Sequence, residues 1–168
     1  MLALFAAALA SSVTASPILE SAQPWWERIT VTVDDKGEQR RCLYETSSSG
    51  AATCDEAMAA SIPGTAGKSG SFSKVTYERR FSPGGAQLDS GRLRPGDTLL
   101  GRQVMFLTFD AQGAIDSCKV VAATGELEFS YDCDAARKEQ FRAQANADPA
   151  ARQAFLTVLA YGHIERIV

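Results

Sequence analysis

Apolar and polar residues alternate along several segments of the chain, and a period of two is typical of strands that bury one face. The pattern predicts strands over 28–34, 38–46 and 71–81 in the first half, and over 101–110 and 115–122 in the second. A short strand over 162–168 is expected to end the chain. The almost continuously apolar run Val104–Phe109 favours a strand inside the sheet, covered on both faces.

Three other segments have helical character. Residues 51–61 have a helical composition and stop before Pro63-Gly64, residues 131–145 begin beside a capping Asp132, and residues 148–159 begin with Asp148-Pro149. The predicted units are therefore β-β-α-β and β-β-α-α-β. We expect an α+β fold in which small antiparallel sheets are backed by helices.

The two halves of the chain repeat one another. Val31–Gly37 runs on to Cys42 and Leu107–Gly113 runs on to Cys118, at a constant spacing of 76 residues from Cys42 to Cys118. Each unit continues with small residues ending in glycine and a second cysteine followed by aspartate, Cys54-Asp55 and Cys133-Asp134. This period indicates a first unit over 28–81, a connector over 82–101 and a second unit over 102–168. Because each unit is small, we expect the two to share one sheet.

The first fifteen residues differ from the rest. Leu2–Ala10 is almost wholly apolar, and Val13-Thr14-Ala15 supplies the small residues that a signal peptidase reads. This predicts a signal peptide over 1–15, cleaved near Ala15/Ser16, and an irregular mature N-terminus over 16–27. The apolar stretch is shorter than the roughly 20 residues of a spanning helix. We expect a periplasmic or secreted protein with no stable membrane span after cleavage.

Four cysteines in a secreted chain of 168 residues imply two disulfides. Three connectivities are possible, and the repeat selects Cys42–Cys54 and Cys118–Cys133, one within each unit. Four thiolates could instead hold zinc, but there is no C-x-x-C pair and an oxidising compartment removes free thiolates. No metal and no cofactor are expected.

Charge and motifs exclude several functions. The net charge is −3 without a basic face, so nucleic acid is not an expected partner. His163 is the only histidine and lies in a predicted strand, where a structural role is favoured over catalysis. The acidic residues around Cys133 (Glu126, Glu128, Asp132, Asp134) suit the first turn of a helix as well as acid–base or calcium chemistry. No catalytic residues are assigned, and an enzyme is not expected.

A strand, a D-x-x-G turn, a strand with a cysteine, small residues ending in glycine and a second cysteine form a familiar order. Residues 103–141, and again 29–58, resemble the disulfide-bearing variety of the C-terminal domain of TonB. The resemblance implies a periplasmic module that binds an extended peptide along the strand after the helix. That strand maps onto Ser71–Phe81 and Gly162–Val168. The binding residues implied are Val75, Tyr77, Arg79, His163 and Ile164.

We therefore expect a non-enzymatic binding module of the cell envelope, whose partner is an envelope protein or an extended peptide. Edge-strand addition is the expected mechanism, because main-chain groups already present supply the hydrogen bonds. Two alternatives stay open. One is a structural envelope protein without a specific partner, and the other is an enzyme of unrecognised type that uses His163 and the acidic cluster Glu126–Asp134.

Overall fold

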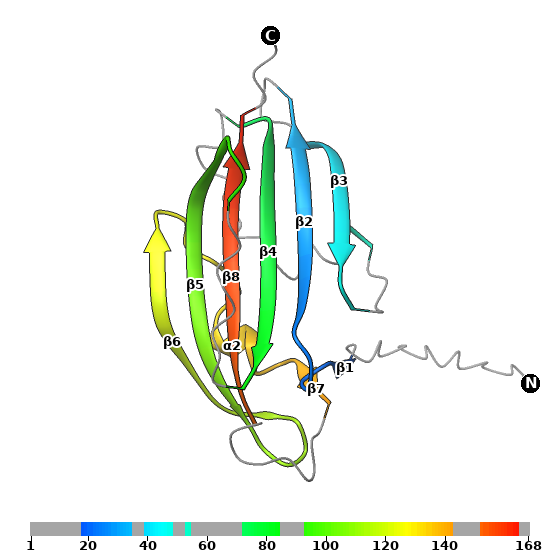
Figure 1. The fold of residues 1–168 in the computed structure, drawn as a ribbon, viewed down its shortest axis with the longest axis vertical. Coiled ribbons are helices and arrows are strands. Elements are labelled where there is room, and N and C mark those ends of the chain that lie inside the picture. Colours follow the sequence, from blue (N-terminus) through cyan, green and yellow to red (C-terminus); the bar gives the residue numbers. More distant parts are fainter. Residues whose placement is uncertain are drawn as a thin grey trace, which may run out of the picture.

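The fold is built on one antiparallel sheet of six strands (Figure 1). This computed structural model describes residues 18–34, 39–48, 53–54, 72–84, 93–142 and 152–164. The sheet strands are β2 (Trp25–Val33), β3 (Gln39–Thr46), β4 (Lys74–Pro83), β5 (Asp97–Phe109), β6 (Ile115–Gly125) and β8 (Gln153–His163). Their order across the sheet is β3-β2-β4-β8-β5-β6, and each neighbouring pair is antiparallel.

The β2–β3 and β5–β6 hairpins pair in the same register, as the sequence repeat requires. Val31 lies opposite Cys42 in the first hairpin, and Leu107 lies opposite Cys118 in the second. Each hairpin also has a β-bulge at the equivalent place, between Thr32 and Val33 and between Thr108 and Phe109. A bulge bends and twists a strand locally. The two hairpins therefore share this distortion and the pairing next to it, but the β5–β6 hairpin has a second register shift, between Val104 and Met105, that the β2–β3 hairpin lacks.

The third strands of the two halves, β4 and β8, are also equivalent. Tyr77 of β4 lies opposite Ile29 of β2. Leu156 of β8 lies opposite Met105 of β5, and Met105 is the repeat counterpart of Ile29. Tyr77 and Leu156 are thus counterparts, which sets the spacing between equivalent residues of β4 and β8.

The halves meet through these equivalent strands at the centre of the sheet. By the spacing of Tyr77 to Leu156, the counterpart of Arg79 is Val158. Arg79 and Val158 are also direct partners in the antiparallel pairing of β4 with β8. An approximate two-fold axis therefore passes through the Arg79–Val158 pair, and both units contribute to one continuous sheet.

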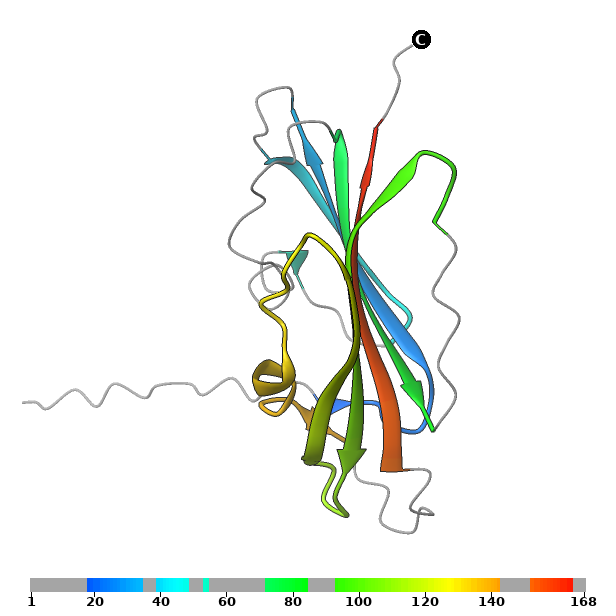
Figure 2. The same ribbon diagram turned by 90° about the vertical axis from the view of Figure 1, so that its left-hand side faces the viewer.

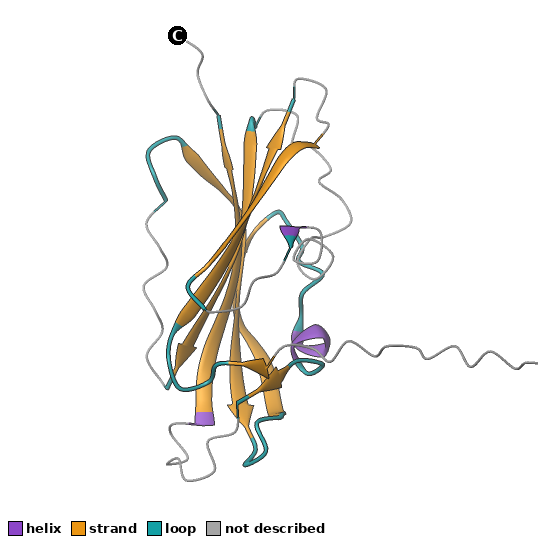
Figure 3. Cartoon of the chain, turned by 90° about the vertical axis from the view of Figure 1, so that its right-hand side faces the viewer, coloured by secondary structure: helices purple, strands orange, loops and turns teal. Residues whose placement is uncertain are grey.

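One face of this sheet is covered by a thin second layer, and we call it the covered face (Figures 2 and 3). The layer contains α2 (Cys133–Ala136) and a parallel pair of short strands, β1 (Ile18–Leu19) and β7 (Gln140–Phe141). Beneath it, Phe81 is fully buried between Trp25 and Phe141, with ring centroids 5.4 and 5.5 Å away. Aromatic side chains bury large apolar areas, so these stacked rings anchor the layer to the sheet.

The predicted cysteine pairing is confirmed. Cys42 of β3 bonds to Cys54, with Cα atoms 6.1 Å apart. Cys118 of β6 bonds to Cys133 of α2, with Cα atoms 5.6 Å apart. Both separations lie in the usual range for disulfides. Each bond links the second strand of a hairpin to the segment that follows it on the covered face.

The predicted α+β class is wrong: the described fold is mostly β and sandwich-like, and no described helix reaches seven residues. The helix expected over 131–145 lasts only from Cys133 to Ala136. The chain then extends as β7, which pairs with β1 and places Phe141 in the core with 1 % of its surface exposed. Extended backbone, and not a helix, therefore buries this ring.

The helix expected over 148–159 is also wrong, because Gln153–His163 forms strand β8. Leu156 and Val158 are buried on the covered face, and Thr157 and Leu159 are buried on the opposite face. A strand buried on both faces is apolar at nearly every position, so its sequence has no period of two. The final strand expected over 162–168 accordingly begins much earlier.

Some predictions lie outside the described residues. They concern the signal peptide over 1–15, most of the helix over 51–61 and residues 85–92 of the connector over 82–101, whose two ends belong to β4 and β5. The N-terminal stretch 16–27 is not wholly irregular, because β1 and the start of β2 lie in it. Among the described helices, none is long and apolar enough to cross a membrane.

Candidate functional site

The residues predicted to bind a partner lie mainly in the interior of the sheet. Val75, Tyr77 and Arg79 belong to β4 and point to the covered face, where each is less than 9 % exposed. His163 ends β8, and the exposed Ile164 follows it. The structure therefore places three of the five residues where a partner strand has no access.

The strands expected to receive a peptide are not edges, and this part of the prediction is corrected. β4 pairs with β2 on one side and β8 on the other, and β8 pairs with β4 and β5. Strand addition needs a row of unpaired main-chain groups. In this sheet the main-chain groups of the two candidate strands pair with each other, because the two halves are joined through β4 and β8.

Arg79 is instead the centre of a buried ionic cluster on the covered face, which we call the Arg79 network. Its Nε donates to Glu27 Oε1 at 2.6 Å, and its Nη1 pairs with Glu139. The guanidinium group lies 4.8 Å from the ring centroid of Tyr131 and 5.3 Å from that of Trp25. The Tyr131 hydroxyl donates to Glu139 Oε2 at 2.8 Å. The network thus ties the second layer to the centre of the sheet.

The electrostatics keep Arg79 charged. Burial by itself lowers the pKa of this guanidinium, but the carboxylates of Glu139 and Glu27 hold the pKa above its ordinary value. Burial raises the pKa of Tyr131, and Glu139 raises it further against the opposing effect of Arg79. Arg79 therefore stays a cation, and Tyr131 stays a neutral hydrogen-bond donor, across the physiological range.

The pocket beside the Arg79 network is too small for a metabolite. It is lined by Glu27, Tyr77, Arg79, Tyr131 and Val158 among others, and its volume is about 10 Å³. That is about the minimum for one water molecule, whereas ligand pockets usually have volumes of hundreds of Å³. With both carboxylates already paired to Arg79, the network is a structural clamp and not a substrate site.

Alkaline pH is expected to destabilise the protein through its tyrosines. Burial raises the pKa of all four, Tyr44, Tyr77, Tyr131 and Tyr161, above the ordinary value of 10.0. Unfolded tyrosines lose their protons near pH 10 while the folded ones keep them, so the unfolded state binds fewer protons there. The stabilisation is complete below pH 10 and is lost as pH rises through the folded pKa values. Absorbance at 295 nm and circular dichroism, recorded together, measure this.

Tyr131→Phe provides the control for the alkaline transition. This substitution removes the most strongly shifted tyrosine, and the loss of stability above pH 10 is expected to become shallower. Ionisation of all four tyrosines near pH 10, with an unchanged circular dichroism spectrum, would contradict the burial of these side chains.

His163 forms an oriented pair with the carboxylate of Asp97. Its Nδ1 lies 2.9 Å from Oδ1 of Asp97, whose side chain is 6 % exposed. The Ser73 hydroxyl donates to the main-chain carbonyl of His163 and not to its imidazole ring. Nucleophilic catalysis needs a hydroxyl or thiol within reach of the ring nitrogen. In the described residues His163 has an orienting carboxylate without the third member of a triad.

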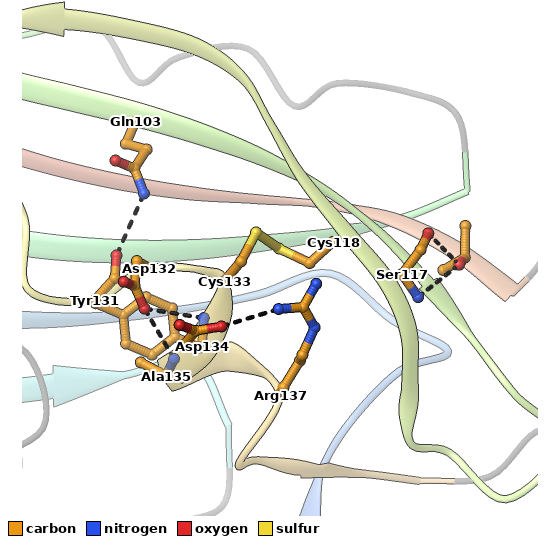
Figure 4. Close-up of a disulfide and its surroundings, with 10 residues drawn as sticks. Gln103, Ser117, Cys118, Tyr131, Asp132, Cys133, Asp134, Ala135 and Arg137 are labelled. Atoms are coloured by element: carbon orange, nitrogen blue, oxygen red, sulfur yellow. Dashed lines mark hydrogen bonds and ion pairs between the residues drawn. A yellow bond between two sulfur atoms is a disulfide. The ribbon is translucent and has the colours of Figure 1, made fainter.

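The acidic cluster around Cys133 is used locally (Figure 4). Asp132 caps α2 by accepting hydrogen bonds from the main-chain amides of Asp134 and Ala135, which lowers the pKa of its carboxyl. Asp134 pairs with Arg137 at 3.0 Å. No three side chains of His, Cys, Asp or Glu converge on a common point in the part of the chain that the structure describes. Asp132 and Asp134 therefore stabilise the short helix α2.

The two outer strands of the sheet differ in a way that bears on binding. β3 and β6 each have one sheet neighbour among the described residues. β3 carries Arg40, Arg41 and Glu45 within eight residues, and charges of this kind are a common protection of exposed strand edges. The second half of β6, Val120–Gly125, carries no charge and is exposed throughout. We call this stretch the β6 edge.

The β6 edge is held firmly in place. Before β6, the Asp110 carboxylate accepts hydrogen bonds from the amides of Gln112 and Ala114. After β6, the amides of Glu126 and Leu127 donate to the Leu100 carbonyl. Between these ends, Cys118 is bonded to α2. A strand fixed at three places presents its free side as a preorganised template, which lowers the entropic cost of binding.

Val120 and Val121, which are 42 and 48 % exposed, were not among the predicted site residues. Their sequence already carried a signal, because an uncharged β-branched pair in a long strand is unusual at an exposed edge. This pair could be interpreted as a binding feature only once the strand order was known, because the same residues in an interior strand would be ordinary core positions.

A scan of protein families, a search of curated proteins and a search of solved structures each found no match to this chain.

Proposed function

We propose that this protein is a non-enzymatic binding protein of the cell envelope that recruits another polypeptide as an added strand beside β6. The observation that carries the proposal is the β6 edge, which is long, uncharged and exposed, while the opposite edge of the same sheet is charged. The two disulfides support an oxidising compartment such as the periplasm. The likeness to the TonB C-terminal domain supports peptide binding as a class of activity.

The direction of the main-chain groups supports binding at Val120. The Ser117 amide donates to the Thr108 hydroxyl of β5, so it points into the sheet. Main-chain groups of an antiparallel strand alternate between its two sides. The amide and carbonyl of Val120 therefore point away from β5, toward an incoming strand. Each hydrogen bond gained there contributes about 0.5–1.5 kcal/mol.

Val120→Pro is expected to weaken partner binding by about tenfold or more, because proline removes the outward donor and leaves the β5–β6 pairing intact. Val120→Thr keeps the amide and the branched side chain, and serves as the matched control. The measurement is photo-crosslinking in the envelope from a crosslinker at Thr124, followed by mass spectrometry. A partner attached in the parent and in Val120→Thr, and lost in Val120→Pro, is the expected result.

Val121→Lys tests the edge without changing the backbone. A lysine there gives the β6 edge the kind of charge that protects β3, so it is expected to reduce capture as well. Thermal unfolding and disulfide content of each variant show whether the fold is retained. Equal capture by the parent, Val120→Pro and Val121→Lys, or capture through Leu43 on β3, would overturn the proposal.

A further inference from the structure

The unequal edges of the sheet fit a closed dimer. An assembly that grows by edge pairing stops at two copies only when one edge of each copy associates and the other does not. β6 carries Asp116 and Lys119 in its first half and no charge over Val120–Gly125, whereas β3 carries Arg40, Arg41 and Glu45 within eight residues. Pairing of β6 with β6 would leave the two charged β3 strands as the outer ends of the joined sheet.

We propose that, in the absence of another partner, the β6 edge is occupied by the β6 strand of a second copy, in antiparallel pairing about a two-fold axis. This inference rests on the proposed binding edge and names its occupant. The dimer has one continuous sheet with the covered faces of both copies on the same side. A partner polypeptide then has to displace the second copy to reach β6.

Symmetry restricts the register of this pairing. In a two-fold antiparallel pair, the residue on the axis lies opposite itself, and it forms a hydrogen-bonded pair with its copy when its main-chain groups point outward. Val120 meets this condition and lies at the start of the uncharged stretch. Lys119 then lies opposite Val121 of the second copy, where β6 shifts register against β5 between Val104 and Met105. No like charges face each other, whereas an axis at Lys119 would place two ammonium groups together.

The chain already contains one junction of this kind. β4 and β8 are equivalent strands of the two halves, and they pair antiparallel with the counterparts Arg79 and Val158 directly opposite each other. The geometry needed for β6 pairing therefore occurs between the repeats of a single copy, with the same twist of the sheet. The intermolecular junction repeats it around Val120, where the uncharged stretch of β6 begins.

The oligomeric state of the mature, oxidised protein tests the proposal. Sedimentation velocity and light scattering from about 1 to about 200 µM cover the range of weak to moderate association. A dimer is expected in the parent and in Val120→Thr, and at least a tenfold higher dissociation constant is expected in Val120→Pro. A monomer at every concentration, or a dimer unaffected by Val120→Pro, would overturn the inference.

Two cysteine variants test the register. Directly opposite residues of a hydrogen-bonded antiparallel pair have Cα atoms about 5.5 Å apart, which a disulfide can span. Val120→Cys is therefore expected to form an intermolecular disulfide rapidly on mild oxidation. Val121→Cys is the matched control, because its counterpart lies farther away, across the axis. Crosslinking of Val121→Cys as fast as Val120→Cys would contradict the register.

These outcomes separate the inference from the proposed function. If the parent protein is a monomer and still captures a partner through β6, the dimer inference is refuted and the proposed binding function stands. If the protein is a dimer and captures no other polypeptide, the dimer inference stands and the proposed binding function is refuted.

Discussion

Arg79→Ala is expected to lower the free energy of unfolding by about 3–5 kcal/mol, as in other proteins where one member of a buried ion pair is removed. The substitution leaves the carboxylates of Glu27 and Glu139 near the core without their cation. It also removes the group that lies between the rings of Trp25 and Tyr131. Urea unfolding followed by tryptophan fluorescence measures the change.

Two comparisons identify the cause of the Arg79 effect. Arg40→Ala removes an arginine whose side chain is 62 % exposed, and a loss of about 1 kcal/mol or less is expected. Arg79→Met combined with Glu27→Gln and Glu139→Gln is expected to recover part of the stability, because no unpaired charge remains. If Arg79→Ala cost no more than Arg40→Ala, the Arg79 network would not be the clamp described above.

Replacing Cys118 and Cys133 together with alanine is expected to cost about 3 kcal/mol, the value for a closed loop of this length. Removing the disulfide is also expected to change the structure, because α2 has only four residues and cannot persist as an isolated helix. Once α2 is released, the Tyr131 side chain is expected to become more exposed to solvent. Its ionisation should then move toward pH 10, which absorbance at 295 nm reports.

The other disulfide is the matched control for this pair. Cys42 and Cys54 are twelve residues apart, so the entropic contribution of their loop is similar. Among the described residues, the buried members of the cluster around them are Ile29 and Val31. Removing this bond is expected to cost less and to leave Tyr131 unchanged. Equal losses, with no change in Tyr131, would mean that the Cys118–Cys133 bond acts on the unfolded chain alone.

The hairpins and the cysteine pairing could be predicted from the sequence because their determinants are local. β2 buries mainly one face, and β3 alternates between half-buried and exposed residues from Cys42 to Thr46, so the alternation survives in the sequence of this hairpin. The gapless spacing from Cys42 to Cys118 then matched the pairing register near each turn, including the bulge that both hairpins have there. A repeat constrains both halves at once, which is why the disulfides followed from it.

The helical predictions failed where burial is decided by distant contacts. The run Ala154–Ala160 is apolar except for Thr157, because β8 lies between β4 and β5 and is buried on both faces. Phe141 looked like the inner face of a helix, but it packs against Phe81 and Phe109 from a two-residue strand. Neither neighbour can be inferred from the local sequence.

The binding edge was misplaced for the same reason. The sequence indicated which segments are strands, but the strand order decides which of them are edges. β4 and β8 carry the predicted binding residues, and they became interior because the two units join through them. The same junction left β3 and β6 outside, which moved the candidate surface from Val75, Tyr77 and Arg79 to Val120 and Val121.

The central junction also has a consequence for the order in which the chain folds. The hairpins close between near neighbours, for example Val33 with Gln39 and Phe109 with Ile115. The β4–β8 ladder joins residues as far apart as Lys74 and His163. Hairpins form within microseconds, whereas distant pairing must first overcome the entropy of closing a long loop. The Cys42–Cys54 bond lies outside the segment between β4 and β8, and the Cys118–Cys133 bond closes only a short part of that segment. Oxidation therefore shortens the loop only slightly, and the meeting of β4 with β8 sets the folding rate.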